Sequence, residues 1–153
     1  MSAPVFVVDT SALIDSLQAD HEAWSEAFAH VQARYDVLAP LRVVYEVGNI
    51  VHRKHPEAFG KSLEDRQQVV AEILQGVTIA AWEKESVARA GEITERHGVT
   101  YYDATFLDLA LATPGSVLLV QDEKLREAAA KALGKERALS LDHLAAAVKK
   151  GTL

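Results

Sequence analysis

Four acidic residues, spread over most of the chain, have side chains whose type and spacing could support chemistry: Asp9, Glu46, Asp103 and Asp122. Asp9 directly follows the apolar run 5–8, and Asp122 follows a second apolar run, 117–120, after one spacer residue. Unbroken apolar runs of this length are typical of parallel strands covered on both faces, and ligands bind outside the carboxyl ends of such strands. Each of these two acids is therefore predicted where chemistry occurs, although Asp9 could equally well cap the helix that follows it.

Carboxylates that meet at one place repel one another. At about 4 Å and a surface-like effective dielectric constant, each like-charged pair costs on the order of 4 kcal/mol before screening by salt. Such a cluster takes up protons or binds cations, and Mg²⁺ and Mn²⁺ are hard cations that prefer oxygen ligands. If the two strands are neighbours, and if Glu46 and Asp103 lean in from nearby helices, the four acids form a candidate metal site.

The elements that must position these acids alternate between short apolar runs and longer helical patterns. Besides the two strands above, short strands are predicted at 37–39, 77–80 and, at an edge, 138–139. Helical patterns follow Ser11 and cover 20–35, 41–54, 62–75, 83–97, about 103–111, 123–133 and 141–150. This alternation predicts a mostly parallel sheet of four to five strands, with helices on both faces and right-handed crossovers. Because no repeat or linker interrupts it, we expect residues 1–153 to form a single domain.

The composition limits the possible functions. The chain has 153 residues and no cysteine, which excludes disulfides and thiolate zinc sites and leaves oxygen or imidazole as metal ligands. Its net charge of -6 argues against general electrostatic binding of nucleic acid, so binding of a phosphate would need a local source of positive charge. No signal peptide or membrane-spanning run is evident, and we expect a cytoplasmic location.

Several polar residues near the acids are weaker candidates. Thr10 and Ser11 could supply hydroxyl groups, although Ser11 is as good a candidate for a helix N-cap. Asn49 could orient Glu46 or contact substrate, or simply lie on the helix surface. Arg53, within the basic run 52–55, could hold a phosphate together with Lys54 or Lys124, but such a run is also common at a solvated helix end.

In sequence order, these motifs resemble those of the PIN domain, and in particular VapC-type toxin ribonucleases. The resemblance rests on Val8-Asp9-Thr10-Ser11, Glu46 with Asn49, Tyr102-Asp103-Ala104, and Gln121-Asp122 followed by Lys124-Leu125, and it spans nearly the whole chain. It implies a three-layer α/β/α sandwich and a metal-dependent endoribonuclease that dimerises. By position, Asp9, Glu46, Asp103 and Asp122 would be the catalytic, metal-binding quartet, with Asp9 and Asp103 the surest ligands.

The implied chemistry is phosphodiester hydrolysis of RNA with one or two Mg²⁺ or Mn²⁺ ions, which lower the pKa of a bound water. A toxin of this type would be held in check by an antitoxin protein, and a homodimer would cover apolar residues of the middle helices. One position departs from the family pattern. Members often carry serine or threonine two residues before the fourth acid, where this chain has Val120, which leaves the role of Asp122 open.

Other readings are less consistent with the residues. A phosphoacceptor receiver domain needs an acidic pair near its first strand, a haloacid-type phosphatase needs two acids spaced by one residue, and a P-loop needs a glycine-lysine run; none is evident. The six histidines show no ligand spacing. The remaining alternative is a catalytically weak PIN-like module that binds RNA or a protein.

Overall fold

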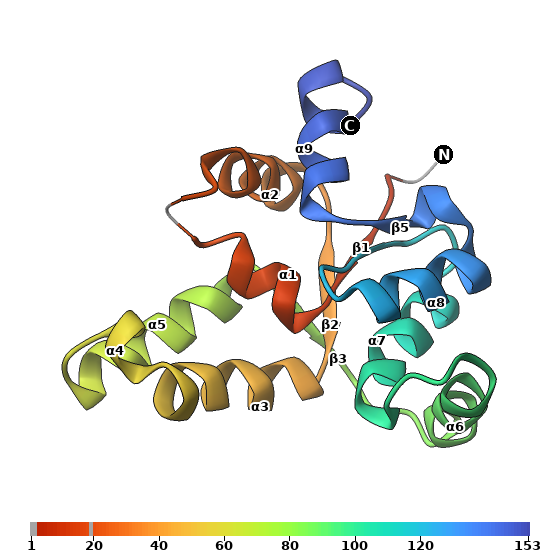
Figure 1. The fold of residues 1–153 in the computed structure, drawn as a ribbon, viewed down its shortest axis with the longest axis horizontal. Helices are drawn as coiled ribbons and strands as arrows, with labels where there is room; N and C mark the ends of the chain where they lie inside the picture. The colour runs from red at the N-terminus through yellow and green to blue at the C-terminus, as the bar shows by residue number, and fades with distance from the viewer. Residues whose placement is uncertain (1–2, 19) are drawn as a thin grey trace.

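The computed structural model describes residues 3–18 and 20–153 and contains one parallel sheet of five strands (Figure 1). The strands are β1 (Phe6–Val8), β2 (Val37–Pro40), β3 (Thr78–Ala80), β4 (Val117–Leu119) and β5 (Ala138–Leu139). Their order is β3-β2-β1-β4-β5, and every neighbouring pair is parallel. The prediction of a mostly parallel sheet of four to five strands is confirmed, with five strands and no antiparallel pair among the described residues.

Strand β1 lies at the centre of the sheet because its residues can be buried from both sides. Phe6, Val7 and Val8 are all completely buried, although successive side chains of a strand point to opposite faces. Both faces of β1 are therefore covered, as its unbroken apolar run predicts. On one side β1 pairs with β2, and on the other it pairs with β4, where Val8 lies opposite Leu119.

Helices of very different length cover the sheet and connect its strands. They are α1 (Thr10–Asp15), α2 (Glu22–Arg34), α3 (Arg42–Asn49), α4 (Pro56–Phe59), α5 (Leu63–Gln75), α6 (Glu85–His97), α7 (Tyr101–Ala112), α8 (Glu123–Leu133) and α9 (Leu141–Lys150). Helix α7 packs against β1, β2 and β4, while α2 packs against α9 and α6 against α7. A short 3₁₀ turn, Lys135–Arg137, leads into β5.

One predicted helix differs from the observed structure. The pattern at 41–54 predicts a single helix, but α3 ends at Asn49 and continues as a π-helical turn, Ile50–Lys54. The turn closes with a hydrogen bond from the His55 amide to the Ile50 carbonyl at 3.0 Å, five residues apart. The basic side chains of the run 52–55 are exposed on this wider turn.

The order of the strands creates a crevice at a defined place. The chain moves outward from β1 to β2 and β3, and then returns to the other side of β1 to form β4 and β5. The two directions diverge between β1 and β4, and in such sheets the crevice at this switch point is where ligands bind. No helix in the described ranges has the length and apolar content needed to cross a membrane.

Candidate functional site

Asp9 lies at this switch point, immediately after β1, and is held there from two directions. Its amide donates to the Leu119 carbonyl at 3.0 Å, which extends the pairing of β1 with β4. Its carboxylate accepts the Ala12 amide at 2.7 Å and the Ser11 hydroxyl at 2.8 Å. Asp9 is therefore the N-cap of α1, which confirms the prediction that it could cap this helix. Ser11, the other candidate for the N-cap, lies inside the helix.

The cap does not account for the electrostatics of Asp9. The residue is only 3% exposed, and burial raises the pKa of its carboxyl from 3.8 to about 7. Hydrogen bonds from Ala12, Ser11 and the Gln121 backbone lower this pKa, whereas the negative charge of Asp122 raises it further. A carboxyl group that is buried without a cation to balance it either holds a proton or attracts a cation.

Asp122 and Asp103 face the same region from two other helices. Asp122 lies three residues beyond β4 and caps α8 by accepting the Leu125 amide at 2.8 Å. Asp103 is half-buried in the first turn of α7, where burial and then the charge of Asp122 raise its pKa. Asp122 therefore lies close enough to both Asp9 and Asp103 for its charge to act on each of them.

Glu46 approaches from α3 and is fixed by two side chains. Thr10 donates its hydroxyl to Oε1 at 3.1 Å, and the Arg42 guanidinium lies 2.9 Å from the same oxygen. Thr10 follows Asp9 in sequence, so this hydrogen bond connects α3 to the residue beside the buried acid. Asn49 is exposed, and in the part of the chain that the structure describes it forms no hydrogen bond with Glu46, so the predicted orienting role of Asn49 belongs to Thr10 and Arg42.

Two cations act on the acids, and only Lys124 was predicted from the sequence. Lys124 and Arg42 both lower the pKa of Asp103, which opposes the effect of burial. Arg42 also stacks its guanidinium on the ring of Tyr102, 3.9 Å from the ring centre. Its position four residues before Glu46 on a helix was the available signal, since such pairs share a face. Arg53, by contrast, lies exposed on the π-helical turn beyond α3.

The donors at this site fit a hard divalent cation in their chemistry. All of them are carboxylate or hydroxyl oxygens, and the charge of Asp122 raises the pKa of Asp9 and of Asp103, a repulsion that a cation relieves. Their spacing is more open than a closed metal site, because within residues 3–18 and 20–153 no three Asp, Glu or His side chains lie close enough together to hold an ion. Val120 is completely buried, so the hydroxyl that the family often has at that position is missing.

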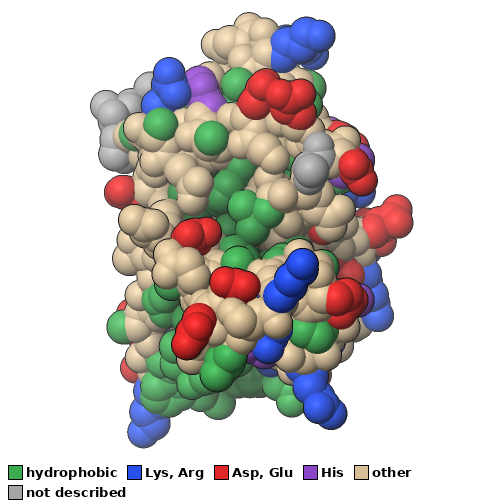
Figure 2. All heavy atoms as spheres, turned by 90° about the vertical axis from the view of Figure 1, so that its left-hand side faces the viewer, with side chains coloured by type: hydrophobic (Ala, Val, Ile, Leu, Met, Phe, Trp, Pro, Cys, Tyr) green, Lys and Arg blue, Asp and Glu red, His purple; other side chains and the backbone are tan. Residues whose placement is uncertain are grey.

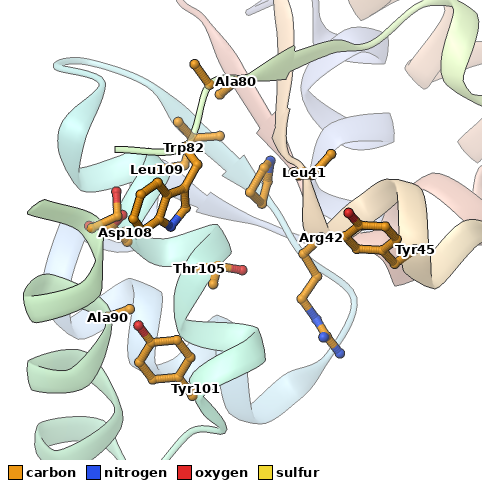
Figure 3. A pocket seen from close by; sticks show the side chains of 13 residues that line it. Leu41, Arg42, Tyr45, Ala80, Trp82, Ala90, Tyr101, Thr105, Asp108 and Leu109 are labelled. Carbon is orange, nitrogen blue, oxygen red and sulfur yellow. The ribbon is translucent and has the colours of Figure 1, made fainter. Parts of the chain in front are cut away.

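An apolar groove, which we call the aromatic groove, lies beside the acids between α3 and the α6–α7 pair (Figure 3). It has a volume of about 260 Å³, and Figure 3 shows Leu41, Arg42 and Tyr45 on one side with Trp82 and Tyr101 across from them. Tyr45 and Trp82 are each 68% exposed. Figure 2 shows hydrophobic side chains gathered along the lower edge of the molecule, the edge at which Figure 1 draws α3 and α6.

An ion pair between buried Asp108 and partly exposed Arg89, at the wall of this groove, was also missed from the sequence. Asp108, in the middle of α7, is 5% exposed and accepts a hydrogen bond from Arg89 Nε of α6 at 2.6 Å. Arg89 also reaches the Ser86 hydroxyl at 3.2 Å and Glu83 at 3.6 Å. The pair ties α6 to α7, and no spacing along the chain indicates it, because the two residues lie 19 positions apart on different helices.

Comparisons with known proteins agree with this architecture. Residues 6–131 match the family model of the PIN domain. The fold is similar to the crystal structure of PAE2754 from Pyrobaculum aerophilum, with a TM-score of 0.69, 19% identity and 96% of each chain covered. It is also similar to the crystal structure of VapBC2 from Rickettsia felis bound to a DNA fragment from their promoter. The TM-score is 0.65 and the identity 13%, and the match covers 89% of this chain and 98% of that chain. No curated protein matches the sequence. Because the family model spans the chain from β1 into α8, the protein belongs to the PIN domain family.

Proposed function

We propose that the protein is a metal-dependent endoribonuclease and the toxin of a toxin-antitoxin pair. PIN domains are generally nucleases, and they usually use divalent metal ions. The observation that carries the proposal for this chain is the buried carboxyl of Asp9 at the switch point of the sheet, whose pKa is raised by burial and by the charge of Asp122, an acid that also acts on Asp103. A stable fold does not need an acid there, because asparagine would cap α1 as well.

In this proposal Asp9, Glu46, Asp103 and Asp122 hold Mg²⁺ or Mn²⁺, with Asp9 and Asp103 as the main ligands. Such an ion, when bound, activates water for attack on phosphorus and neutralises charge on the phosphodiester. Ser11 and Ala12 keep the Asp9 carboxylate in a fixed orientation through their hydrogen bonds, and Thr10 does the same for Glu46. Removal of a residue that orients a metal ligand in this way typically lowers metal affinity or activity by about 10- to 100-fold.

The decisive test is cleavage of total RNA by the purified protein. We expect cleavage with Mn²⁺ that EDTA abolishes and that an Asp9→Asn variant lacks, because the variant keeps the cap but loses a charged ligand. Single-stranded DNA of matched length serves as the substrate control. Wild-type protein that binds RNA but leaves it intact in Mn²⁺ would favour the alternative, a catalytically weak RNA-binding or protein-interaction module.

The substrate phosphates require cations, because the chain as a whole is acidic. We propose that Lys124, near Asp103, and the exposed Arg53 and Lys54 hold flanking phosphates of single-stranded RNA. Reversal of Arg53 and Lys54 to glutamate should weaken RNA binding and reduce its dependence on salt. An unchanged salt dependence would remove this pair from the contact surface and leave Lys124 as the phosphate contact.

We propose an antitoxin partner because the fold is similar to that of VapBC2, which was crystallised with a DNA fragment from their promoter. Expression of the wild-type chain in the cytoplasm of a bacterial host should arrest growth, and expression of the Asp9→Asn variant should not. Growth arrest that persists in the Asp9→Asn variant would show that the effect does not come from the nuclease site.

We further propose that the protein forms a homodimer through the aromatic groove. A contiguous exposed apolar patch on one face is typical of an interface, and here Leu41, Tyr45 and Trp82 contribute to it. Analytical ultracentrifugation should give a dimer for the wild type and a monomer for Trp82→Glu. A dimer in both would place the interface elsewhere.

A further inference from the structure

Arg42 lies between the acids and the aromatic groove and touches both. Its Nε is 2.9 Å from Glu46 Oε1, its guanidinium stacks on Tyr102, and it lines the groove. It also acts on Asp103, the residue next to Tyr102, and lowers its pKa. In the chain alone, Arg42 therefore supplies positive charge at a site built to hold a cation.

The contact between Arg42 and Glu46 is a charge contact without a directed hydrogen bond. Although the two atoms are 2.9 Å apart, Arg42 Nε is a buried donor with no hydrogen-bond partner in the described part of the chain. Buried donors are normally paired by a directed hydrogen bond, so Glu46 is an imperfect partner for this nitrogen. Glu46, for its part, has a well-formed hydrogen bond from Thr10 on the same oxygen.

Arg42 has a second support besides Glu46. The stack on Tyr102 holds the guanidinium by its face, so the ring does not cover its edges, which carry the N–H donors. Those edges match the planar, two-point geometry of a phosphate. If Glu46 turned toward a metal ion, Arg42 would lose its present counter-charge but would remain at the mouth of the site on Tyr102.

We infer that Arg42 exchanges partners: it balances Glu46 while the site is empty of metal, and it binds a phosphate of the RNA once Glu46 ligates a divalent cation. This inference rests on the proposed ribonuclease function and adds a residue that contacts the substrate. It also makes Arg42 a competitor of the metal ion for Glu46. The two roles have opposite consequences when the guanidinium is removed.

The test measures metal and RNA binding separately in an Arg42→Gln variant. Calorimetric titration with Mn²⁺ alone should show roughly two- to fivefold tighter binding than in the wild type, the size expected for loss of a partly exposed ion pair. Binding of a labelled single-stranded oligoribonucleotide, with Ca²⁺ in place of Mn²⁺ to prevent turnover, should be about tenfold weaker, as for loss of a charged hydrogen bond. A merely structural role would weaken both.

Two matched variants separate charge from position. Lys124→Gln removes the other cation that acts on Asp103 but makes no contact with Glu46, so its effect on Mn²⁺ affinity should be smaller. Tyr102→Phe keeps the ring and should behave as the wild type, whereas Tyr102→Leu should lose RNA affinity and retain Mn²⁺ affinity. Tyr102 is 59% exposed, so neither substitution should unfold the protein.

Unchanged or weaker Mn²⁺ binding by Arg42→Gln, or unchanged RNA binding, would overturn the inference. If Mn²⁺-dependent cleavage by the wild type were retained alongside either result, the proposed nuclease function would stand and only the role of Arg42 would fall. A wild-type protein that neither binds Mn²⁺ nor cleaves RNA would overturn both.

Discussion

Asp9 and Asp108 are both aspartates with at most 5% of their surface exposed, yet their electrostatic surroundings are opposite. Asp108, between α6 and α7, has Arg89 at 2.6 Å as its counter-ion. Asp9, at the end of β1, is influenced by another acid, Asp122, and the causes of its pKa shift include no cation. A buried charge is stable when it is paired, so the α6–α7 pair is built for stability and the end of β1 is not.

The difference separates a residue that stabilises the fold, Asp108, from a residue that the fold only positions, Asp9. Asp108 joins two helices, and its charge is neutralised locally. Asp9 is positioned by hydrogen bonds that Ala12 and Ser11 donate to its carboxylate and that its own amide donates to Leu119, but its charge is left uncompensated within the described chain. Removing each carboxylate should therefore damage a different property.

The largest expected effect is on activity, in Asp9→Asn. Loss of a charged ligand should reduce Mn²⁺-dependent RNA cleavage by on the order of 100-fold or more, beyond the range typical of residues that only orient ligands. The free energy of unfolding at pH 8, measured by urea denaturation, should not fall, because asparagine still caps α1 and an unpaired buried charge is gone. A clear loss of stability in this variant would mean that Asp9 is a structural residue like Asp108.

Asp108→Asn should show the reverse. The substitution removes the nearer of the two acids beside Arg89 and leaves only Glu83 at 3.6 Å, so we expect the free energy of unfolding to fall measurably, although less than for a fully buried pair. Mn²⁺ binding, measured by calorimetry, should be retained. Arg89→Gln is the matched control and should be destabilised to a similar degree; an undamaged fold in both variants would contradict the structural role of the pair.

The pH dependence of stability should follow Asp9. The pKa of its carboxyl is about 7 in the folded protein, above the ordinary value of 3.8 for an unfolded chain, so the folded state binds the proton more tightly. Its contribution to stability is therefore complete below about pH 4 and is lost as the pH rises through 7. The melting temperature of the metal-free wild-type protein should fall between pH 4 and 8. The fall should be smaller in Asp9→Asn, where only the raised pKa of Asp103 still contributes, and unchanged in Asp108→Asn.

The smallest expected effect on stability is that of Asp122→Asn. Since the charge of Asp122 raises the pKa of both Asp9 and Asp103, its removal should move the pH range of the decline toward lower pH. Asparagine can still cap α8. An unmoved range would show that Asp122 does not share the crevice with the other two acids.

Much of the fold could be predicted because the strands are short, unbroken apolar runs. Parallel sheets bring the carboxyl ends of their strands to one edge, so Asp9 and Asp122 could be placed near each other before any coordinates. The observed pairing of Val8 with Leu119 confirms that their strands are neighbours. The acids are thus positioned mainly by topology, which patterns along a sequence report well.

Contacts between helices were less predictable. The hydrogen bond from Thr10 to Glu46 and the pair of Arg89 with Asp108 depend on how far apart two helices pack, which no single-helix pattern specifies. Asn49 shares a predicted face with Glu46, but it is exposed while Thr10 and Arg42 occupy the carboxylate. Arg42 alone could have been found, from its spacing of four residues before Glu46.

Because β1 lies between β2 and β4, the site is complete only when distant parts of the chain have come together. Asp9 is near the start of the chain, yet its amide is bonded to Leu119, more than a hundred residues further on. A nascent or nicked polypeptide that ends in the turn before β4 would contain Asp9, Glu46 and Asp103 without the strand that completes the crevice. Such a fragment should be harmless to RNA, so whatever nuclease activity the chain has should appear only in molecules whose two halves have already joined.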